Sequence, residues 1–199
     1  MAKKKELTAD EIRQQISELQ EQLKLIENKK PDFESIQAGD HFNYCGLEWV
    51  CLDPDFEGGV LSIVAKAWKD EVKFSEKNDN NYRTSDIREI LLKELAPKLE
   101  GCVINYFPDL TEENGKSFED VHYEDPVFLL SLCEYIRYSK FIPYDNYGDY
   151  WWLRTPRLRS ASRGSSASTW LVYTSGYVYI RGTYAVGALA CAPACIFIR

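Results

Sequence analysis

The hydrophobic periodicity of the chain changes once, close to Pro31. Before this proline, apolar residues recur at alternating intervals of four and three, which is the spacing of one face of an α-helix. From Gly39 onward they fall into short runs separated by turn residues, which is typical of strands. The sequence therefore predicts an N-terminal helical segment over residues 1–31 and a separate domain over residues 36–199.

The first segment carries the signals of one helix over residues 7–30. Thr8 is placed to cap this helix, Glu11 completes a reciprocal capping pattern, and Pro31 ends the helix. Because the apolar stripe is narrow and polar residues surround it, we expect residues 8–30 to form a coiled coil between copies of the chain. A lone helix lying on the domain is the alternative, and mixed Ile and Leu at the core positions leave dimer and trimer open. The stripe consists of Ile12, Ile16, Leu19, Leu23 and Ile26.

The domain is predicted to be α+β, with two helices that flank a mixed, mostly antiparallel sheet. Strands are expected at residues 41–45, 47–53 and 60–65, with a turn at residues 55–59. One helix is expected to begin after Ser85 and to run to about Lys98. The next is expected to begin at Asp125-Pro126 and to run to Ile136, after a polar loop over residues 111–125.

The six cysteines are predicted to be buried free thiols, with disulfides or metal ligands as the alternative. Most of them lie in apolar runs, and no two are separated by only two residues. His41 and His122 stand alone, so we expect neither a zinc site nor another cofactor. The cysteines are at positions 45, 51, 102, 133, 191 and 195.

The first six residues carry the positive charge of a secretory leader, but no apolar run follows them. No later window approaches the roughly 18 uninterrupted apolar residues that a membrane span requires. We therefore expect a cytoplasmic protein, or one carried within a larger assembly, without membrane association.

Charged residues are unevenly distributed along the chain. Residues 150–199 contain six arginines and no Lys, Asp or Glu, which gives +6, whereas the preceding 149 residues carry −13. Such a segment can bind anions or nucleic acid, but arginines dispersed among serines and tyrosines are a weak case for it. The last third therefore differs in chemistry from the rest of the chain.

An aromatic hairpin is predicted in this last third. A strand at residues 150–156 precedes a loop at 160–169, and two further strands, at 170–174 and 177–181, flank a Ser175-Gly176 turn. Alternation divides the hairpin into an inward and an outward face. The inward residues are Trp170, Val172, Val178 and Ile180, and the outward residues are Leu171, Tyr173, Tyr177, Tyr179 and Arg181.

The outward face has the chemistry of a recognition surface. Tyr provides a large contact area at little entropic cost, while Ser and Gly adapt their contacts. The alternative is that the N-terminal part of the domain covers these tyrosines and leaves only their hydroxyls wet. We expect Trp152, Trp170, Val172 and Val178 to support the surface from below. The predicted ligand-binding residues are Arg157, Leu158, Arg159, Ser160, Ser162, Arg163, Leu171, Tyr173, Tyr177, Tyr179, Arg181 and Tyr184.

Short motifs run through the domain. The last third contains Trp-Trp-Leu-Arg-Thr-Pro at 151–156, Trp170-x-Val172, Gly176-x-Val178, Gly187 and Ala192-Pro193-Ala194. Gly-Leu-Glu-Trp-Val stands upstream at 46–50, as does Asn80-Asn81-Tyr82 followed by Ser85, Ile87 and Arg88. Over about residues 36–199, these motifs resemble the C-type-lectin-fold variable proteins that retroelements diversify in phages and bacteria.

The resemblance implies a C-type-lectin-like fold, related to the formylglycine-generating-enzyme-like branch, with a variable binding region at about residues 157–187. It implies a macromolecular ligand, which we expect to be a protein, and a location in the cytoplasm or a phage virion. In this family, mutagenic copying at adenines does not produce Lys, Glu, Gln, Met or Trp at varied positions. Residues 157–187 lack the first four, although Lys and Glu supply 32 of the first 156 residues, and Trp170 belongs to the signature.

Three other functions find less support in the sequence. Formylglycine-generating oxidases use a cysteine pair, but Cys191 and Cys195 are expected on one face of a small-residue core strand, and no catalytic motif accompanies them, so no enzyme is expected. A calcium-dependent lectin needs carboxylates, which the segment after Asp149 lacks, although ring stacking on a sugar stays open. Tyrosines interleaved with arginines can also bind single-stranded nucleic acid, which the acidic remainder of the chain opposes.

Overall fold

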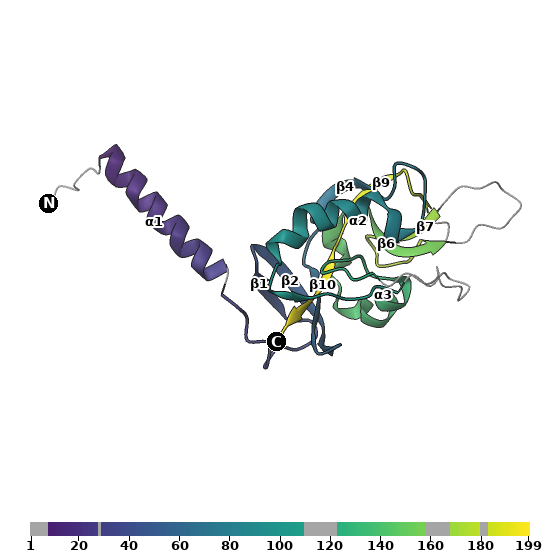
Figure 1. Ribbon diagram of the computed structural model, residues 1–199, viewed down its shortest axis with the longest axis horizontal. Coiled ribbons are helices and arrows are strands. Elements are labelled where there is room, and N and C mark those ends of the chain that lie inside the picture. The colour runs from purple at the N-terminus through teal and green to yellow at the C-terminus, as the bar shows by residue number, and fades with distance from the viewer. Residues whose placement is uncertain (1–7, 28, 110–122, 158–167, 180–182) are drawn as a thin grey trace, which may run out of the picture.

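The computed structural model describes residues 8–27, 29–109, 123–157, 168–179 and 183–199 (Figure 1). Three α-helices are assigned in these ranges: α1 Ala9–Glu27, α2 Asp86–Ile90 and α3 Leu132–Tyr138. The strands are β1 His41–Tyr44, β2 Leu47–Phe56, β3 Gly59–Val64, β4 Lys69–Lys73, β5 Val103–Ile104, β6 Tyr150–Arg157, β7 Ser168–Tyr173, β8 Thr183–Tyr184, β9 Ala188–Cys191 and β10 Ala194–Ile198. The predicted α+β class is confirmed. No helix in the described ranges combines the length and the apolar character needed to cross a membrane.

The strands form two sheets, where the sequence predicted one. The first sheet has the order β1-β2-β3-β10-β5 and is antiparallel, whereas the second, β4-β9-β6-β7-β8, is mixed because β6 runs parallel to β9. Pro193, which has no N–H for a ladder, separates β9 from β10 and so divides the C-terminal run between the sheets. Cys191 and Cys195 consequently lie in different sheets, and the expectation that they share a face of one strand is wrong.

The predicted cap of the N-terminal helix is confirmed. Thr8 and Glu11 cap α1 reciprocally: the Thr8 backbone N–H donates to the Glu11 carboxylate (2.7 Å), and the Glu11 N–H donates to Thr8 Oγ1 (3.3 Å). The predicted meander forms through β1, β2 and β3. The turn between β2 and β3 is shorter than the expected turn at residues 55–59. Glu57 and Gly58 adopt φ values of 49° and 79°, and β2 therefore continues to Phe56.

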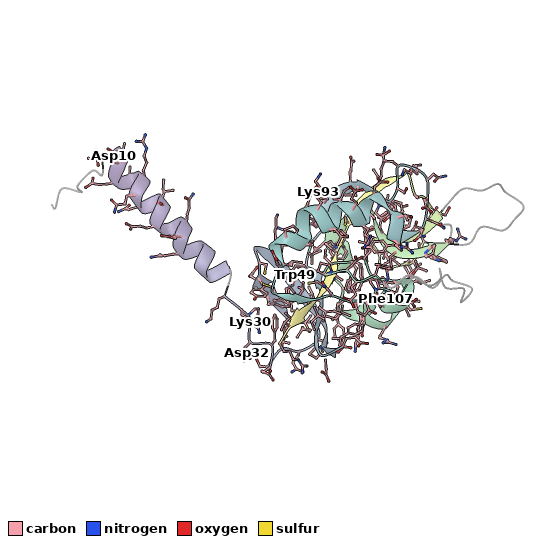
Figure 2. The ribbon with its side chains drawn as sticks, in the orientation of Figure 1. Asp10, Lys30, Asp32, Trp49, Lys93 and Phe107 are labelled. Carbon is pink, nitrogen blue, oxygen red and sulfur yellow. The ribbon has the colours of Figure 1, made fainter. Side chains whose placement is uncertain are left out.

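Buried aromatic rings join the two ends of the domain. Trp49 is fully buried in the core (Figure 2), where its Nε1 donates to the Tyr44 carbonyl at 3.0 Å. Its ring meets Phe197 of β10 edge to face, with centroids 5.1 Å apart. Phe33 stacks on the same Phe197 at 5.6 Å. The C-terminal strand is thereby held between segments from the beginning of the domain.

The third helix begins later than predicted. Residues 126–131 are not helical, because Phe128 exchanges both backbone hydrogen bonds with Ala194 (2.9 and 2.7 Å). Ser131 is the true N-cap, and with Glu134 it forms a complete capping box. The Ser131 cap at Ser-x-x-Glu, and not Asp125-Pro126, was therefore the helix start signal. The Ser85 cap is confirmed, and α2 continues as a π-turn, Leu91–Leu95, and a 3-10 turn, Ala96–Lys98.

The cysteines only partly follow the prediction. Cys51, Cys191 and Cys195 are buried free thiols, as expected, and burial raises the pKa of Cys51 to about 12. Cys133 is exposed, because it falls on the outer side of α3. Cys45 and Cys102 are half-buried, with their sulfur atoms 3.4 Å apart.

A buried ion pair links β6 to α3. Arg154 is fully buried, and its Nη1 and Nη2 atoms donate to the two carboxylate oxygens of Glu134 at 2.6 and 2.7 Å. The same guanidinium donates to the carbonyls of Leu129 (2.6 Å) and Asp109 (2.8 Å). A second pair joins Arg88 of α2 to the fully buried Asp125 at 2.7 Å. Ion pairs therefore fix both ends of the segment between Asp125 and α3.

Replacing Arg154 with Met should lower the free energy of unfolding by about 3–5 kcal/mol, because it leaves the Glu134 carboxylate without its buried partner. Urea denaturation followed by circular dichroism measures this. The double variant Arg154→Met/Glu134→Gln should recover part of the loss, since it removes the uncompensated charge. Lys73→Met, which breaks the exposed pair with Glu76, should cost less than about 1 kcal/mol. Equal losses for Arg154→Met and Lys73→Met would contradict the assignment.

Candidate ligand-binding surface

The predicted hairpin forms at the end of β7. The Tyr173 N–H donates to the Tyr177 carbonyl and the Tyr179 N–H to the Leu171 carbonyl, both at 2.9 Å, and Val172 bridges Val178. Gly176 completes the turn with φ of 77°. The turn prediction at Ser175-Gly176 is thus confirmed, although β7 begins at Ser168 and not after the expected loop end at Thr169.

Three outward tyrosines of the hairpin are exposed: Tyr177 at 76%, Tyr173 at 41% and Tyr179 at 38%. Tyr150 of β6 lies opposite Tyr173 in the ladder, and its ring centroid is 5.0 Å from that of Tyr173 and 5.8 Å from that of Tyr179. We call Tyr150, Tyr173, Tyr177 and Tyr179 the tyrosine patch. The alternative that the rest of the domain covers these hairpin tyrosines is wrong. Tyr150 was not predicted to belong to this surface, because only the register of β6 against β7 places it beside Tyr173.

The inward face supports the patch, with two corrections. Val172 is fully buried, as expected, and Trp170 and Val178 are half-buried against the core. Trp152 is also fully buried, but it pairs with Leu171, so it lies on the outward face and does not support the hairpin from below. Its Nε1 donates to the Val72 carbonyl at 2.7 Å. Leu171 is only 2% exposed, so its assignment to the ligand-binding surface is wrong. Leu171 lies opposite the fully buried Trp152, so the outward face is covered at this position and becomes exposed at Tyr173.

A hydroxyl from α3 holds the hairpin turn. Tyr135 donates through its OH to the Gly176 carbonyl at 2.5 Å, and its ring meets Trp151 edge to face at 5.6 Å. Burial raises the pKa of Tyr135 to about 12, so the hydroxyl keeps its proton and remains a donor at neutral pH. The tip of the hairpin is therefore tied to the core of the domain.

The strand ends on either side of residues 158–167 are also fixed. Arg157 and Ser168 pair in the β6–β7 ladder, and Asn80 Nδ2 donates to the carbonyls of Ser168 (2.9 Å) and Arg157 (3.4 Å). The Arg157 guanidinium lies over the Trp170 ring, 5.2 Å from its centroid. Asn80, a residue of the motif at 80–82, was not predicted to contribute to this region.

Several predicted site residues are not described. Leu158, Arg159, Ser160, Ser162, Arg163 and Arg181 lie outside the described residues, as does the inward residue Ile180. Tyr184 belongs to β8, of which the backbone is described. Of the predicted set, the structure thus brings together Tyr173, Tyr177 and Tyr179, whereas Arg157 pairs with Ser168 at the other end of the β6–β7 ladder.

The described C-terminal arginines do not form a free basic face. Arg154 is buried on Glu134, and Arg199 pairs with Asp55 at 3.3 Å and donates to the Pro54 carbonyl. Arg157 is the third, and it is stacked on Trp170. The +6 charge of the last third therefore overstates what these side chains offer to an anion.

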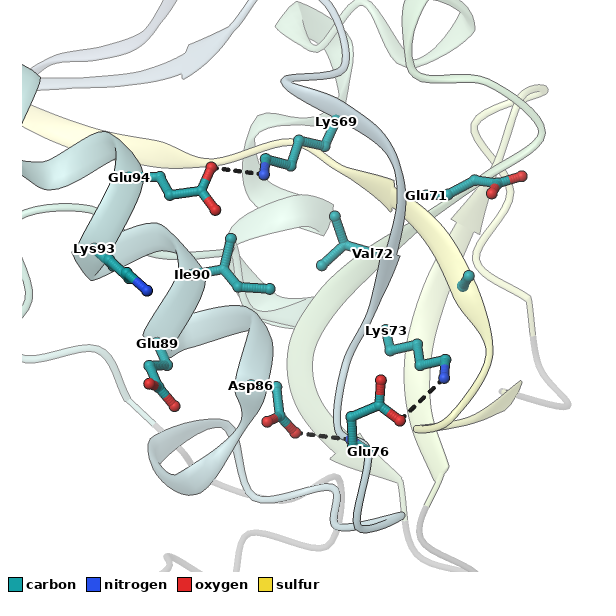
Figure 3. Close-up of a pocket in the computed structure, with 11 residues that line it drawn as sticks. Lys69, Glu71, Val72, Lys73, Glu76, Asp86, Glu89, Ile90, Lys93 and Glu94 are labelled. Atoms are coloured by element: carbon teal, nitrogen blue, oxygen red, sulfur yellow. Dashed lines mark hydrogen bonds and ion pairs between the residues drawn. The ribbon is translucent and has the colours of Figure 1, made fainter.

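A charged groove of about 550 Å³ lies elsewhere, between α2 and β4 (Figure 3). Figure 3 shows Lys69 directed at Glu94 (2.6 Å) across this groove and Lys73 directed at Glu76 (3.0 Å) on its β4 side. Val72 and Ile90 also line it. Because lysines and carboxylates are interspersed along it, the groove presents no field of a single sign to a ligand. Within the described ranges, no group of three or more His, Cys, Asp or Glu side chains could hold a metal ion.

No protein-family model matches this chain, and no match was found among curated proteins or solved structures. We therefore interpret the tyrosine patch from its own geometry and from the motifs around it.

Gly176→Ala should destabilise the protein more than Gly46→Ala. Both glycines have positive φ, so replacing either one with alanine should lower the free energy of unfolding by about 1–2 kcal/mol. A Cβ at 176 would also lie 2.9 Å from the Tyr144 ring, whereas nothing lies within 4 Å of one at 46, so we expect roughly 1 kcal/mol more at 176. Denaturant unfolding of the two variants measures the difference, and adding Tyr144→Ala should reduce it. Equal costs would show that the turn is not packed as described.

Proposed function

We propose that this protein binds a macromolecular ligand, most simply a protein, through the tyrosine patch together with residues 157–163. The observation that carries the proposal is the exposure of three neighbouring tyrosines on a hairpin whose opposite face packs against the core. Gathered aromatic rings at a surface mark interaction sites more often than solvated faces do.

The proposed mechanism is equilibrium binding, in which no bond is made or broken. The rings of the patch are rigid anchors, because Val172 packs beneath the hairpin and Tyr135 holds its turn. A rigid anchor loses little conformational entropy on binding, and neighbouring Ser and Gly adapt to the ligand. Affinity would therefore depend on the few aromatic side chains of the tyrosine patch.

We further propose that the protein belongs to the diversified C-type-lectin-like class. The motif residues support this, because those described have scaffold roles: Trp152 and Arg154 are buried, Asn80 bonds both strand ends, and Arg88 pairs with Asp125. The exposed tyrosines of the hairpin, by contrast, lie within residues 157–187, the segment without Lys, Glu, Gln or Met. A fixed scaffold and a separate, replaceable surface are what diversification requires.

The triple variant Tyr173→Ala/Tyr177→Ala/Tyr179→Ala should lose at least about 100-fold in affinity, since a single aromatic anchor can contribute about 2 kcal/mol to the free energy of binding. The wild-type protein is first used to select binders from a displayed protein library and from a glycan array, and the variant is then titrated with them. Ile136→Ala, which removes an exposed apolar side chain from α3, is the matched control and should bind as the wild type does. Unchanged binding by the triple variant would refute the proposed surface. Selection of glycans alone would replace the protein ligand with a carbohydrate.

A further inference from the structure

The helix α1 stands away from the domain. Figure 1 shows it separated from both sheets, at the end opposite to β6 and β7, and Figure 2 shows its side chains projecting on all sides. Ile12, Ile16 and Leu19 of its apolar stripe are exposed, at 45%, 49% and 64%. These three residues share one face, so the helix presents an uncovered apolar seam.

Such a helix needs packing from outside its own chain. Isolated helices of this length are marginal in water, and most helical stability in proteins comes from packing of the apolar face. The Thr8 and Glu11 cap supports only the first turn. Because the domain does not cover Ile12, Ile16 or Leu19, the missing contacts must come from another molecule.

We propose that this molecule is another copy of the chain, packed along α1. The spacing of the stripe, alternately four and three residues, is that of helices that supercoil around one another, whereas a helix lying on a globular surface needs a broader stripe. The same short period along all of α1 lets identical helices align layer by layer.

The charges of α1 are compatible with identical partners. In the heptad register of the stripe, charged residues at flanking positions would select or reject a partner. Three of these positions hold uncharged glutamines, Gln15, Gln20 and Gln22, and the other two hold Arg13 and Glu27, which differ in sign. The ion pair of Asp10 with Arg13 and the hydrogen bond of Gln14 to Glu18 form within one helix. Copies therefore meet along the seam with little repulsion, and nothing at these glutamines favours a partner of opposite charge.

Association through α1 would leave the tyrosine patches free, because the patch is carried by β6 and by the hairpin at the end of β7, and Figure 1 shows α1 separated from both strands. If the patch binds as proposed above, two or three copies would engage a multivalent target together. Linked sites of this kind raise overall avidity by 10²–10⁴ without new contacts. Self-association itself does not depend on the proposed function.

Sedimentation equilibrium of the full chain at about 100 μM, a concentration at which a short coiled coil is populated, tests the proposal. The expected mass is two or three times 23.0 kDa. Ile16→Glu, in the seam, should return the mass to 23.0 kDa and reduce helical circular dichroism, while near-UV circular dichroism of the domain stays unchanged. Ser17→Glu adds the same charge outside the seam and should keep the wild-type mass.

A monomeric wild type would overturn the proposal, as would identical masses for Ile16→Glu and wild type. Both results concern mass alone and involve no ligand. A failure of the tyrosine patch to bind any target would therefore leave this inference standing, and a monomeric chain would leave the binding proposal standing.

Discussion

The ion pair between Arg154 and Glu134 organises the end of the molecule that carries the tyrosine patch. Burial by itself would lower the pKa of Arg154, but the adjacent carboxylate outweighs burial and raises it, so the guanidinium keeps its charge inside the protein. Glu134 also completes the capping box of α3, and Arg154 donates a hydrogen bond to the Leu129 carbonyl. The buried Arg154 side chain thus links β6, α3 and the segment before α3, and β7, the first strand of the hairpin, pairs with β6.

This arrangement separates what must stay constant from what can change. Beneath the hairpin, Val172 is buried in the core, and Asn80 holds the strand ends at Arg157 and Ser168. Above it, Tyr173 and Tyr177 contact solvent. In a strand, successive side chains point to opposite faces, so a change at an exposed position leaves the buried neighbour in place. The proposed binding function depends on this division.

Local sequence signals predicted much of the fold. The Thr8 and Ser85 caps, the first meander and the Ser175-Gly176 turn depend on residues close in sequence, and the structure confirms them.

Features set by distant contacts were missed. The division of residues 188–198 between two sheets depends on the partners of β9 and β10, and the late start of α3 depends on the bridge between Phe128 and Ala194. At the candidate surface, alternation placed three tyrosines correctly, but it could not reveal that Leu171 is buried or that Tyr150 joins the patch.

A diversified surface on a fixed scaffold is tested most directly by comparing the 3′ end of the gene with its flanking DNA. We predict a near-repeat that differs at adenines, with the differences falling on codons for exposed residues such as Tyr173, Tyr177 and Tyr179 and sparing those for Trp152, Arg154 and Val172. Absence of a repeat, or differences that fall on the buried codons, would contradict the proposed division between scaffold and surface.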